Sequence, residues 1–189
     1  MDIFEAIQTR RSVRDFSADK IPKGDLEKIL NMGRYAPTAG NIQPWKFLLL
    51  KKINRKGKFK EKLAKNIARI VEELAIPDEE KKLRKKNTKE ALNNIFNAAL
   101  IILLFVDTNT YPDLVIYDGA LAAQNIMLAA HALGYGSSFQ TSFFPERIVK
   151  DFFRIPEHYK FICALPIGKV GKKPIMPEKK PLEELTWKD

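Results

Sequence analysis

The sequence contains few of the residues from which disulfides, metal sites and nucleophilic catalytic sites are built. Of its 189 residues, one is cysteine and two are histidine. A single cysteine excludes an internal disulfide and a multi-cysteine metal site, and His131 and His158 alone argue against a histidine-rich metal site. Cys163 lies in an alternating apolar run, so we interpret it as a buried structural thiol. The sequence shows no recognisable Ser-His-Asp triad or Cys-His pair.

Long hydrophobic runs are also absent. The longest purely apolar run, residues 98–106, is too short to span a bilayer, and the first residues, Met1-Asp2-Ile3-Phe4-Glu5, lack the basic-then-apolar order of a signal peptide. We therefore expect a cytoplasmic protein that does not bind a membrane. The length predicts one domain, residues 1–189, with a sizeable core, because no internal repeat or linker divides the chain.

Positive charge is concentrated in one segment. The formal net charge is +10, and residues 46–90 hold sixteen Lys or Arg against seven Asp or Glu, an excess of nine. Such a segment is typical either of a nucleic-acid patch or of surface helices with solvated lysine faces. We favour the second interpretation, because the segment lacks interleaved aromatic residues and matches no nucleic-acid motif.

Apolar periodicity predicts alternating helices and strands. Asp2 is placed to cap a first helix, with Glu5 three residues later, and Phe4 and Ile7 are expected to face the core. The strand over 99–106 is expected to be buried on both faces. The other predicted elements are helices from Pro22 to before Pro37 and over 58–76, 78–96, 117–133 and 145–153, and strands over 47–50, 137–142 and 159–167.

Two segments, one helix and the C-terminal tail, are expected to pack against other parts of the molecule or against a second subunit. The helix over 117–133 is rich in alanine and ends before Gly134, which indicates close packing against a sheet or a second subunit. After Gly168 the chain carries three prolines and several lysines. A tail this irregular must lie across another surface to be ordered.

A basic segment follows the first helix. Arg10, Arg11 and Arg14 surround Ser12, and arginine offers a rigid fork of donors that matches phosphate oxygens. The segment therefore predicts a phosphate or other polyanion as ligand, although a merely solvated basic stretch remains the alternative.

A loop at residues 36–47 is the second informative stretch. Its small and amide side chains supply many hydrogen-bonding groups with little bulk, which suits a flat polar heterocycle, although it is also compatible with an ordinary Pro-rich loop. By contrast, Gly134-Tyr135-Gly136 only begins like a dinucleotide fingerprint: it follows a helix, and Phe139 stands where the third glycine belongs. We interpret it as a helix-to-strand turn.

Taken together, the chain resembles the FMN-dependent nitroreductase family. The resemblance is carried by four motifs in the family's order over most of the chain. They are Arg10-Arg11-Ser12-Val13-Arg14, the loop from Pro37 to Trp45, the helix from Asp118-Gly119-Ala120 to Gly134-Tyr135-Gly136-Ser137, and Leu165-Pro166-Ile167-Gly168.

The resemblance implies an α+β fold with three α/β/α layers, a central mixed and mainly antiparallel sheet, and an intertwined homodimer. The tail, about residues 168–189, would extend over the partner subunit. It also implies a composite FMN site, in which Arg10, Arg11 and Ser12 hold the phosphate and ribityl chain and Arg14 approaches the N1/O2 edge of the flavin. The remaining implied cofactor-binding residues are Pro37, Thr38, Ala39 and Asn41 from the partner, the backbone of Gln140, Thr141 and Ser142 near N5 and O4, and Lys179 and Lys180 of the tail.

Some features depart from the family pattern. The usual glycine is missing from residues 140–142, and only Asn93 and Asn94 are candidates for the contacts to the pyrimidine edge. No catalytic residue of the protein is implied, because the flavin carries the chemistry: NADH or NADPH donates a hydride, and a small acceptor such as a nitroaromatic or quinone is reduced. The alternatives are other flavin chemistry, such as ene reduction or reductive dehalogenation, and a non-enzymatic basic binding protein.

Overall fold

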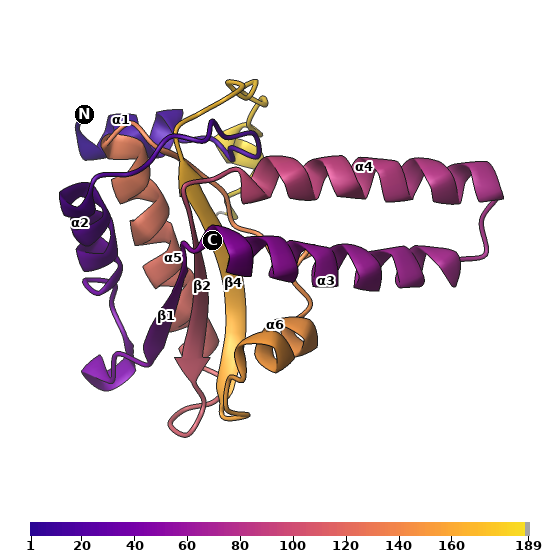
Figure 1. Cartoon of the computed structure of the whole chain (residues 1–189). Coiled ribbons are helices and arrows are strands. Elements are labelled where there is room, and N and C mark those ends of the chain that lie inside the picture. The colour runs from indigo at the N-terminus through magenta and orange to yellow at the C-terminus, as the bar shows by residue number, and fades with distance from the viewer. Residues whose placement is uncertain (188–189) are drawn as a thin grey trace.

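A four-stranded antiparallel sheet forms the centre of the molecule (Figure 1). The structure, a computed structural model, describes residues 1–187. The spatial order of the strands is β1-β2-β4-β3, and each neighbouring pair is antiparallel. The parallel component of the predicted mixed sheet is a single isolated bridge between Ser12 and Ser137 within the described residues. The strands are β1 (Trp45–Leu50), β2 (Leu100–Asp107), β3 (Gly136–Ser137) and β4 (Tyr159–Gly168).

Helices cover both faces of the sheet, which confirms the three-layer α/β/α architecture. One layer contains α2 (Lys23–Gly33) and α5 (Val115–Ala132), and the opposite layer contains α3 (Ile53–Glu72), α4 (Asp78–Phe96) and α6 (Glu146–Phe153) (Figure 1). The short α1 (Ile3–Thr9) packs against α5. Figure 1 shows that α3 and α4 form a long hairpin that projects beyond the sheet.

Two hydrophobic cores lie on the two faces of the sheet, and β2 contributes to both. Leu100, Ile102, Leu104 and Val106 join the core under α2 and α5. The residues between them point to the other face, because side chains alternate along a strand; there Ile101, Leu103 and Phe105 meet Phe59 of α3 and Phe144. Residues 100–106 are all at most 2% exposed, which confirms the strand predicted to be buried on both faces.

The prediction of the helix over 58–76 was wrong at both ends. The observed α3 begins at Ile53 and ends at Glu72. Apolar periodicity starts only at Phe59, whereas residues 53–58 are largely lysine, arginine and asparagine, most of them exposed. Lysine and arginine are good helix formers, so this first turn and a half is helical without an apolar signature. The predicted helix over 78–96, in contrast, coincides with α4.

The strand predicted over 137–142 was also wrong, because β3 comprises only two residues. Ser137 pairs with Ile167, and after a gap Gln140 pairs with Ala164 in the same register. That register places Pro166 opposite Ser138. Proline has no N–H and cannot donate to the ladder, so regular pairing stops at this position.

The first helix begins as predicted but faces the other way. Asp2 caps it, since its Oδ1 accepts from the Glu5 N–H at 2.9 Å. Phe4 and Ile7, expected in the core, are 75% and 55% exposed, and Ala6 is the residue turned inward. The helix lies at the surface, so its larger apolar side chains are not covered by any of the residues that the structure describes.

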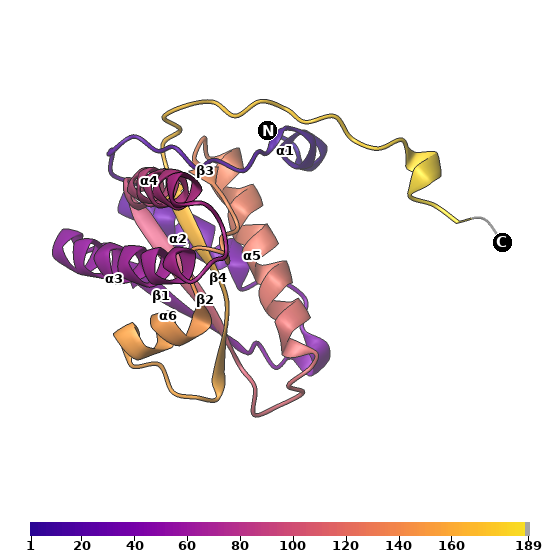
Figure 2. The ribbon, with the colours of Figure 1, turned by 90° about the vertical axis from the view of Figure 1, so that its right-hand side faces the viewer.

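The C-terminal segment leaves the body of the molecule. After Val170, which pairs with Phe16, the chain runs extended past α1 and away from the sheet (Figure 2). Within the described residues, Ile175 is 92% and Trp187 is 99% exposed. None of the helices between residues 1 and 187 is both long and apolar enough to cross a membrane.

Candidate functional site

The two halves of the predicted site lie at opposite ends of the sheet in one chain. Ser12 and Val13 pair with Ser137 of β3, which in turn pairs with Ile167 of β4. Ile167 also pairs with Leu100, so this half of the site lies at the start of β2. The loop over 37–44 leads into Trp45, which pairs with Val106 at the other end of β2. Leu100 and Val106 are six residues apart on β2, and a strand rises about 3.3 Å per residue, so the two ends lie roughly 20 Å apart. One chain therefore cannot bring the two halves into contact.

The basic segment is held against the sheet by its backbone. α1 ends at Thr9, and the non-helical backbone of the next residue, Arg10, leads the chain alongside β3. The Val13 N–H donates to the Ser137 carbonyl at 2.9 Å. A Cβ on Gly136 would lie 2.8 Å from the side-chain carbons of Val13, so only glycine permits this approach. The Arg10-to-Arg14 segment is consequently fixed in place beside a strand.

No ion pair within residues 1–187 neutralises the arginines of this segment. Nη1 of Arg10 is buried without a hydrogen-bond partner among the described residues. Burial, and then the neighbouring Arg11 charge, lower the pKa of Arg10. Arg11 itself is tied down, because its Nη1 donates to the carbonyls of Gln8 and Arg10 at 2.7 and 2.6 Å. Two adjacent guanidiniums, one with an unused buried donor, suit an anion such as a phosphate.

His131 adjoins this segment, although no motif of the sequence points to it. Its Nε2 lies 2.8 Å from Oγ1 of Thr9. Burial lowers the pKa of His131, the charges of Arg10 and Arg11 lower it further, and Glu5 opposes them. A local signal could not have found this residue, because α5 brings it from more than a hundred positions away.

The end of β3 contributes a second group without a partner among the described residues. Oγ of Ser137 is buried and has no hydrogen-bond partner among residues 1–187. The Gln140 N–H donates to the Ala164 carbonyl at 2.9 Å, and its side chain donates to Oγ of Ser138. The Gln140 N–H is thus already used. Of the three residues predicted to face the flavin, exposed Thr141 and Ser142 keep backbone N–H groups without a partner in the described chain.

The loop at the other end is held in an unusual backbone conformation. Gly40, Asn41 and Gln43 have φ of 56°, 57° and 49°, in the left-handed region that costs energy for residues with a side chain. Side chains hold it there: Oγ1 of Thr38 accepts from the Gln43 N–H at 3.3 Å, and Nε2 of Gln43 donates to Oδ1 of Asn41 at 3.2 Å. The 3₁₀ turn η1 (Ala39–Asn41) therefore projects at the surface as a defined shape, with Asn41 exposed.

The remaining predicted site residues lie apart from the arginines. Lys179 and Lys180 are on the extended tail, where Lys180 pairs with Glu184 at 3.7 Å. Asn93 accepts a hydrogen bond from Nζ of Lys60 at 2.9 Å, and Asn94 is half-buried on the same helix, α4.

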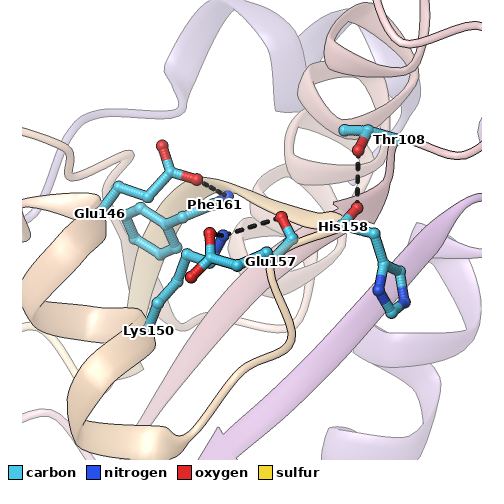
Figure 3. A network of polar contacts seen from close by, with 6 residues as sticks. All are labelled: Thr108, Glu146, Lys150, Glu157, His158 and Phe161. Atoms are coloured by element: carbon cyan, nitrogen blue, oxygen red, sulfur yellow. Dashed lines mark hydrogen bonds and ion pairs between the residues drawn. The ribbon is translucent and has the colours of Figure 1, made fainter.

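A separate network of hydrogen bonds stabilises the start of β4, the end opposite the arginine segment (Figure 3). Lys150 of α6, 9% exposed, donates to the carboxylate and the carbonyl of Glu157 at 2.8 and 2.9 Å. Glu146 accepts from the Phe161 N–H at 2.9 Å, and Thr108 donates to the His158 carbonyl at 2.8 Å. These bonds satisfy backbone groups at the turn into β4, so we interpret the network as structural.

Cys163 is buried as predicted, and its burial raises the pKa of the thiol. A thiol that stays protonated is a poor nucleophile. Within residues 1–187, no group of three or more His, Cys, Asp or Glu side chains is placed to hold a metal ion.

The chain is similar in sequence to proteins of several organisms. A protein of Methanothermobacter thermautotrophicus is 30% identical over 178 residues, covering 92% of this chain and 80% of the relative. One from Archaeoglobus fulgidus is 28% identical, covering 88% and 84%. Both are named "Putative NADH dehydrogenase/NAD(P)H nitroreductase". A protein of Lactiplantibacillus plantarum named "CLA biosynthesis enone reductase" is 25% identical, covering 92% of this chain and 88% of the relative.

Solved structures share the fold. The nitroreductase-like family protein from Bacillus cereus superposes with a TM-score of 0.78 at 20% identity, covering 100% of this chain and 96% of that one. Iodotyrosine deiodinase bound to FMN and 3-iodo-L-tyrosine superposes with a TM-score of 0.77 at 23% identity, covering 95% and 96%. The model of the Nitroreductase family matches residues 7–169, a span from the end of α1 to the end of β4. The chain therefore belongs to the nitroreductase family.

Proposed function

We propose that this protein is an NAD(P)H-dependent FMN oxidoreductase that works as a homodimer. The observation that carries the proposal is the buried Nη1 of Arg10 beside Arg11, which has no hydrogen-bond partner in the described part of the chain. Such a donor costs free energy until an acceptor arrives, and a phosphate monoester supplies anionic acceptors of the right geometry. The residues present thus fit the cofactor that the family implies.

The cofactor would be held from several elements. In this proposal Arg10, Arg11 and Ser12 bind the phosphate and ribityl chain, and exposed Arg14 lies along the flavin edge, where a positive charge favours the reduced, anionic form. The unused N–H groups of Thr141 and Ser142 face the ring. The contribution of the partner is the loop containing Pro37, Thr38, Ala39 and Asn41, and the tail lysines Lys179 and Lys180 close over the phosphate.

The redox chemistry would come from the bound flavin, which takes a hydride from NADH or NADPH and returns it to a small acceptor such as a nitroaromatic or quinone. The protein residues provide position and charge. No side-chain acid, base or nucleophile is required for this role, which agrees with the inert environment of Cys163.

Dimerisation follows from the separation of the two halves of the site. Because they lie at opposite ends of one sheet, a two-fold partner must bring the loop of one subunit to the arginines of the other. Exposed apolar residues support this: Ile3, Phe4 and Ile7 of α1 and Tyr117 and Leu121 of α5 are all at least 44% exposed. We further propose that residues 1–189 form a single domain whose C-terminal tail, about 168–189, lies across the partner subunit; residues 188 and 189 of this tail lie outside the described residues. The cytoplasmic location stays a prediction from the sequence.

Related flavin chemistry is the second candidate. An enone reductase is among the sequence relatives, and a deiodinase shares the fold. Ene reduction and reductive dehalogenation would use the same cofactor residues, so the site described above does not separate them from nitro or quinone reduction.

The proposal is tested first by the absorption spectrum of the protein after FMN addition and removal of free ligand. Retained flavin absorbance is expected, and its absence would leave only the non-enzymatic basic binding protein. Oxidation of NADH and of NADPH is then followed with a nitroaromatic, a quinone, an enone and an iodinated phenol as acceptors. The acceptor that gives the highest kcat/KM identifies the reaction class.

A further inference from the structure

A cavity of about 640 Å³ is lined by residues that belong to neither half of the proposed flavin site. It lies between the segment that precedes α2, the start of α3 and the start of β2. Its apolar lining includes Ile21, Leu26, Phe96 and Leu100. The last three of these are buried, so the floor of the cavity is part of the packed core.

Lysine side chains surround this apolar floor. Lys20, Lys23, Lys51, Lys56 and Lys60 line the cavity, whereas Asp19 is its one carboxylate. Asp19 already accepts from Ser17 at 2.8 Å and lies 4.0 Å from Nζ of Lys169. Of the five lysines, only Lys23 forms an ion pair within the described residues, with Glu27 at 3.6 Å. The cavity thus has an excess of unneutralised positive charge.

Lys56 and Lys60 are the least exposed of the five lysines. Both are half-buried and lie one turn apart on α3, where like charges four residues apart repel. Lys56 donates to the Ala98 carbonyl, and Lys60 to Asn93. Burial lowers the pKa of Lys56, and Lys60 lowers it further. An anion between these ammonium groups would relieve both the repulsion and the incomplete solvation.

Gly57 lies on the cavity wall between these lysines. Glycine within a helix is less stable than alanine by roughly 0.5–1 kcal/mol, and usually a close neighbour requires it. A Cβ on Gly57 would meet nothing within 4 Å. Glycine at this position therefore leaves open volume in the cavity and does not serve a close contact between two elements.

We propose that this cavity binds an amphipathic anion, with its carboxylate or phosphate at Lys56 and Lys60 and its apolar body against Phe96, Leu26 and Leu100. The site is distinct from the arginine segment. Val13, Phe16 and Ala98 form a small buried cluster, in which Val13 faces Gly136 and Ala98 lines the cavity. That cluster lies between the two sites, so binding here does not require that the proposed function is correct.

Calorimetric titration of the FMN-saturated protein with decanoate tests the proposal. We expect saturable binding, with 1-decanol at least about tenfold weaker because it lacks the charge. Decyl phosphate and inorganic phosphate extend the test: decyl phosphate should compete with decanoate, and inorganic phosphate should not. Equal affinity for decanoate and decanol, or no saturable binding of decanoate, would overturn the proposal.

Three variants locate the site. Lys60→Met should weaken decanoate binding about tenfold, whereas Lys62→Met, on an exposed position of the same helix, should not change it. Gly57→Leu should fill the cavity and abolish binding while leaving the thermal midpoint unchanged or raised. If Gly57→Leu folds and still binds decanoate with unchanged affinity, the ligand lies elsewhere and the proposal is wrong.

Discussion

Arg10 carries more of the functional argument than any other side chain. Its guanidinium is half-buried beside another cation, and one of its nitrogens has no partner in the described chain. A protein that retains such a group without a ligand loses stability. The group is therefore the reason for placing an anion beside Arg10 in the proposed function.

Replacing Arg10 tests this directly. Arg10→Ala should weaken FMN binding by about 1.5–3 kcal/mol, the range for a hydrogen bond to a charged group, and the affinity is measured by titrating apoprotein with FMN. Arg147→Ala, on an exposed position of α6, is the matched control. Arg14→Ala should mainly lower the reduction potential of the bound flavin. Unchanged affinity in Arg10→Ala would remove the phosphate assignment.

The pKa of His131 provides a second test for an anion beside Arg10 and Arg11. Its pKa is lowered by burial and by Arg10 and Arg11, so an anion that neutralises the arginines should raise that pKa. The measurement is an NMR titration of the His131 ring protons with and without FMN. His158, at the opposite end of β4, serves as the internal reference.

The sign of the accompanying pH effect also follows. Since the folded state binds a proton at His131 less readily than the unfolded state, whose histidine pKa is about 6.5, apoprotein stability should fall as the pH drops below that value. FMN should reduce this loss. A His131 pKa that does not respond to FMN would place the anion elsewhere.

Among the elements, α5 is the helix packed most closely against the sheet. A Cβ on Gly119 would lie 2.7 Å from Ile162 and 2.9 Å from Val106. Gly119→Ala should therefore destabilise the protein by about 1–3 kcal/mol through overpacking, measured by urea denaturation. Gly57→Ala, in an uncrowded position of α3, is the control and should stabilise by about 0.5–1 kcal/mol. Equal effects of the two changes would contradict the packing described.

The α3–α4 hairpin accounts for the concentration of positive charge. Its distal half is a pair of solvated helices, in which Lys85 pairs with Glu72 and Arg84 with Glu80 at 2.8 Å. We expect only weak binding of duplex or single-stranded DNA, without sequence preference and lost with added salt. Fluorescence anisotropy at several salt concentrations checks this. Specific nanomolar binding at physiological salt would show that the hairpin is a nucleic-acid site.

For the whole molecule, cofactor binding and assembly should be linked. A ligand that contacts both subunits favours the dimer by mass action, so dilution should release flavin. Sedimentation at a series of concentrations, with flavin and protein absorbance recorded together, measures both.

The substitution Phe4→Asp tests the same link between dimerisation and flavin binding. Phe4 is 75% exposed in the single chain, so the change should leave the fold intact but weaken the dimer and its flavin affinity together. Gln8→Asp, an exposed polar position on the same helix, is the comparison for added charge. A stable monomer of about 22 kDa that keeps its FMN would rule out the composite site.

The sequence by itself determined the family, the order of the elements and the core of the sheet. These properties follow from local signals: the Asp2 cap, the apolar run that became β2, the alanine-rich α5 and the four motifs of the resemblance. The basic segment also predicted an anion from its composition alone, because clustered guanidiniums have few other uses.

Only the tertiary structure decided which surfaces are left open. Phe4 and Ile7 carry an apolar pattern that is the same whether the covering surface belongs to this chain or to another, so periodicity alone placed them wrongly in the core. Strand pairing placed the Asn41 loop and Arg10 at opposite ends of the sheet, and Pro166 shortened β3 through a missing N–H. The position of His131 and the lysine-lined cavity beside Gly57 likewise depend on contacts between segments distant in the sequence, which no local pattern records.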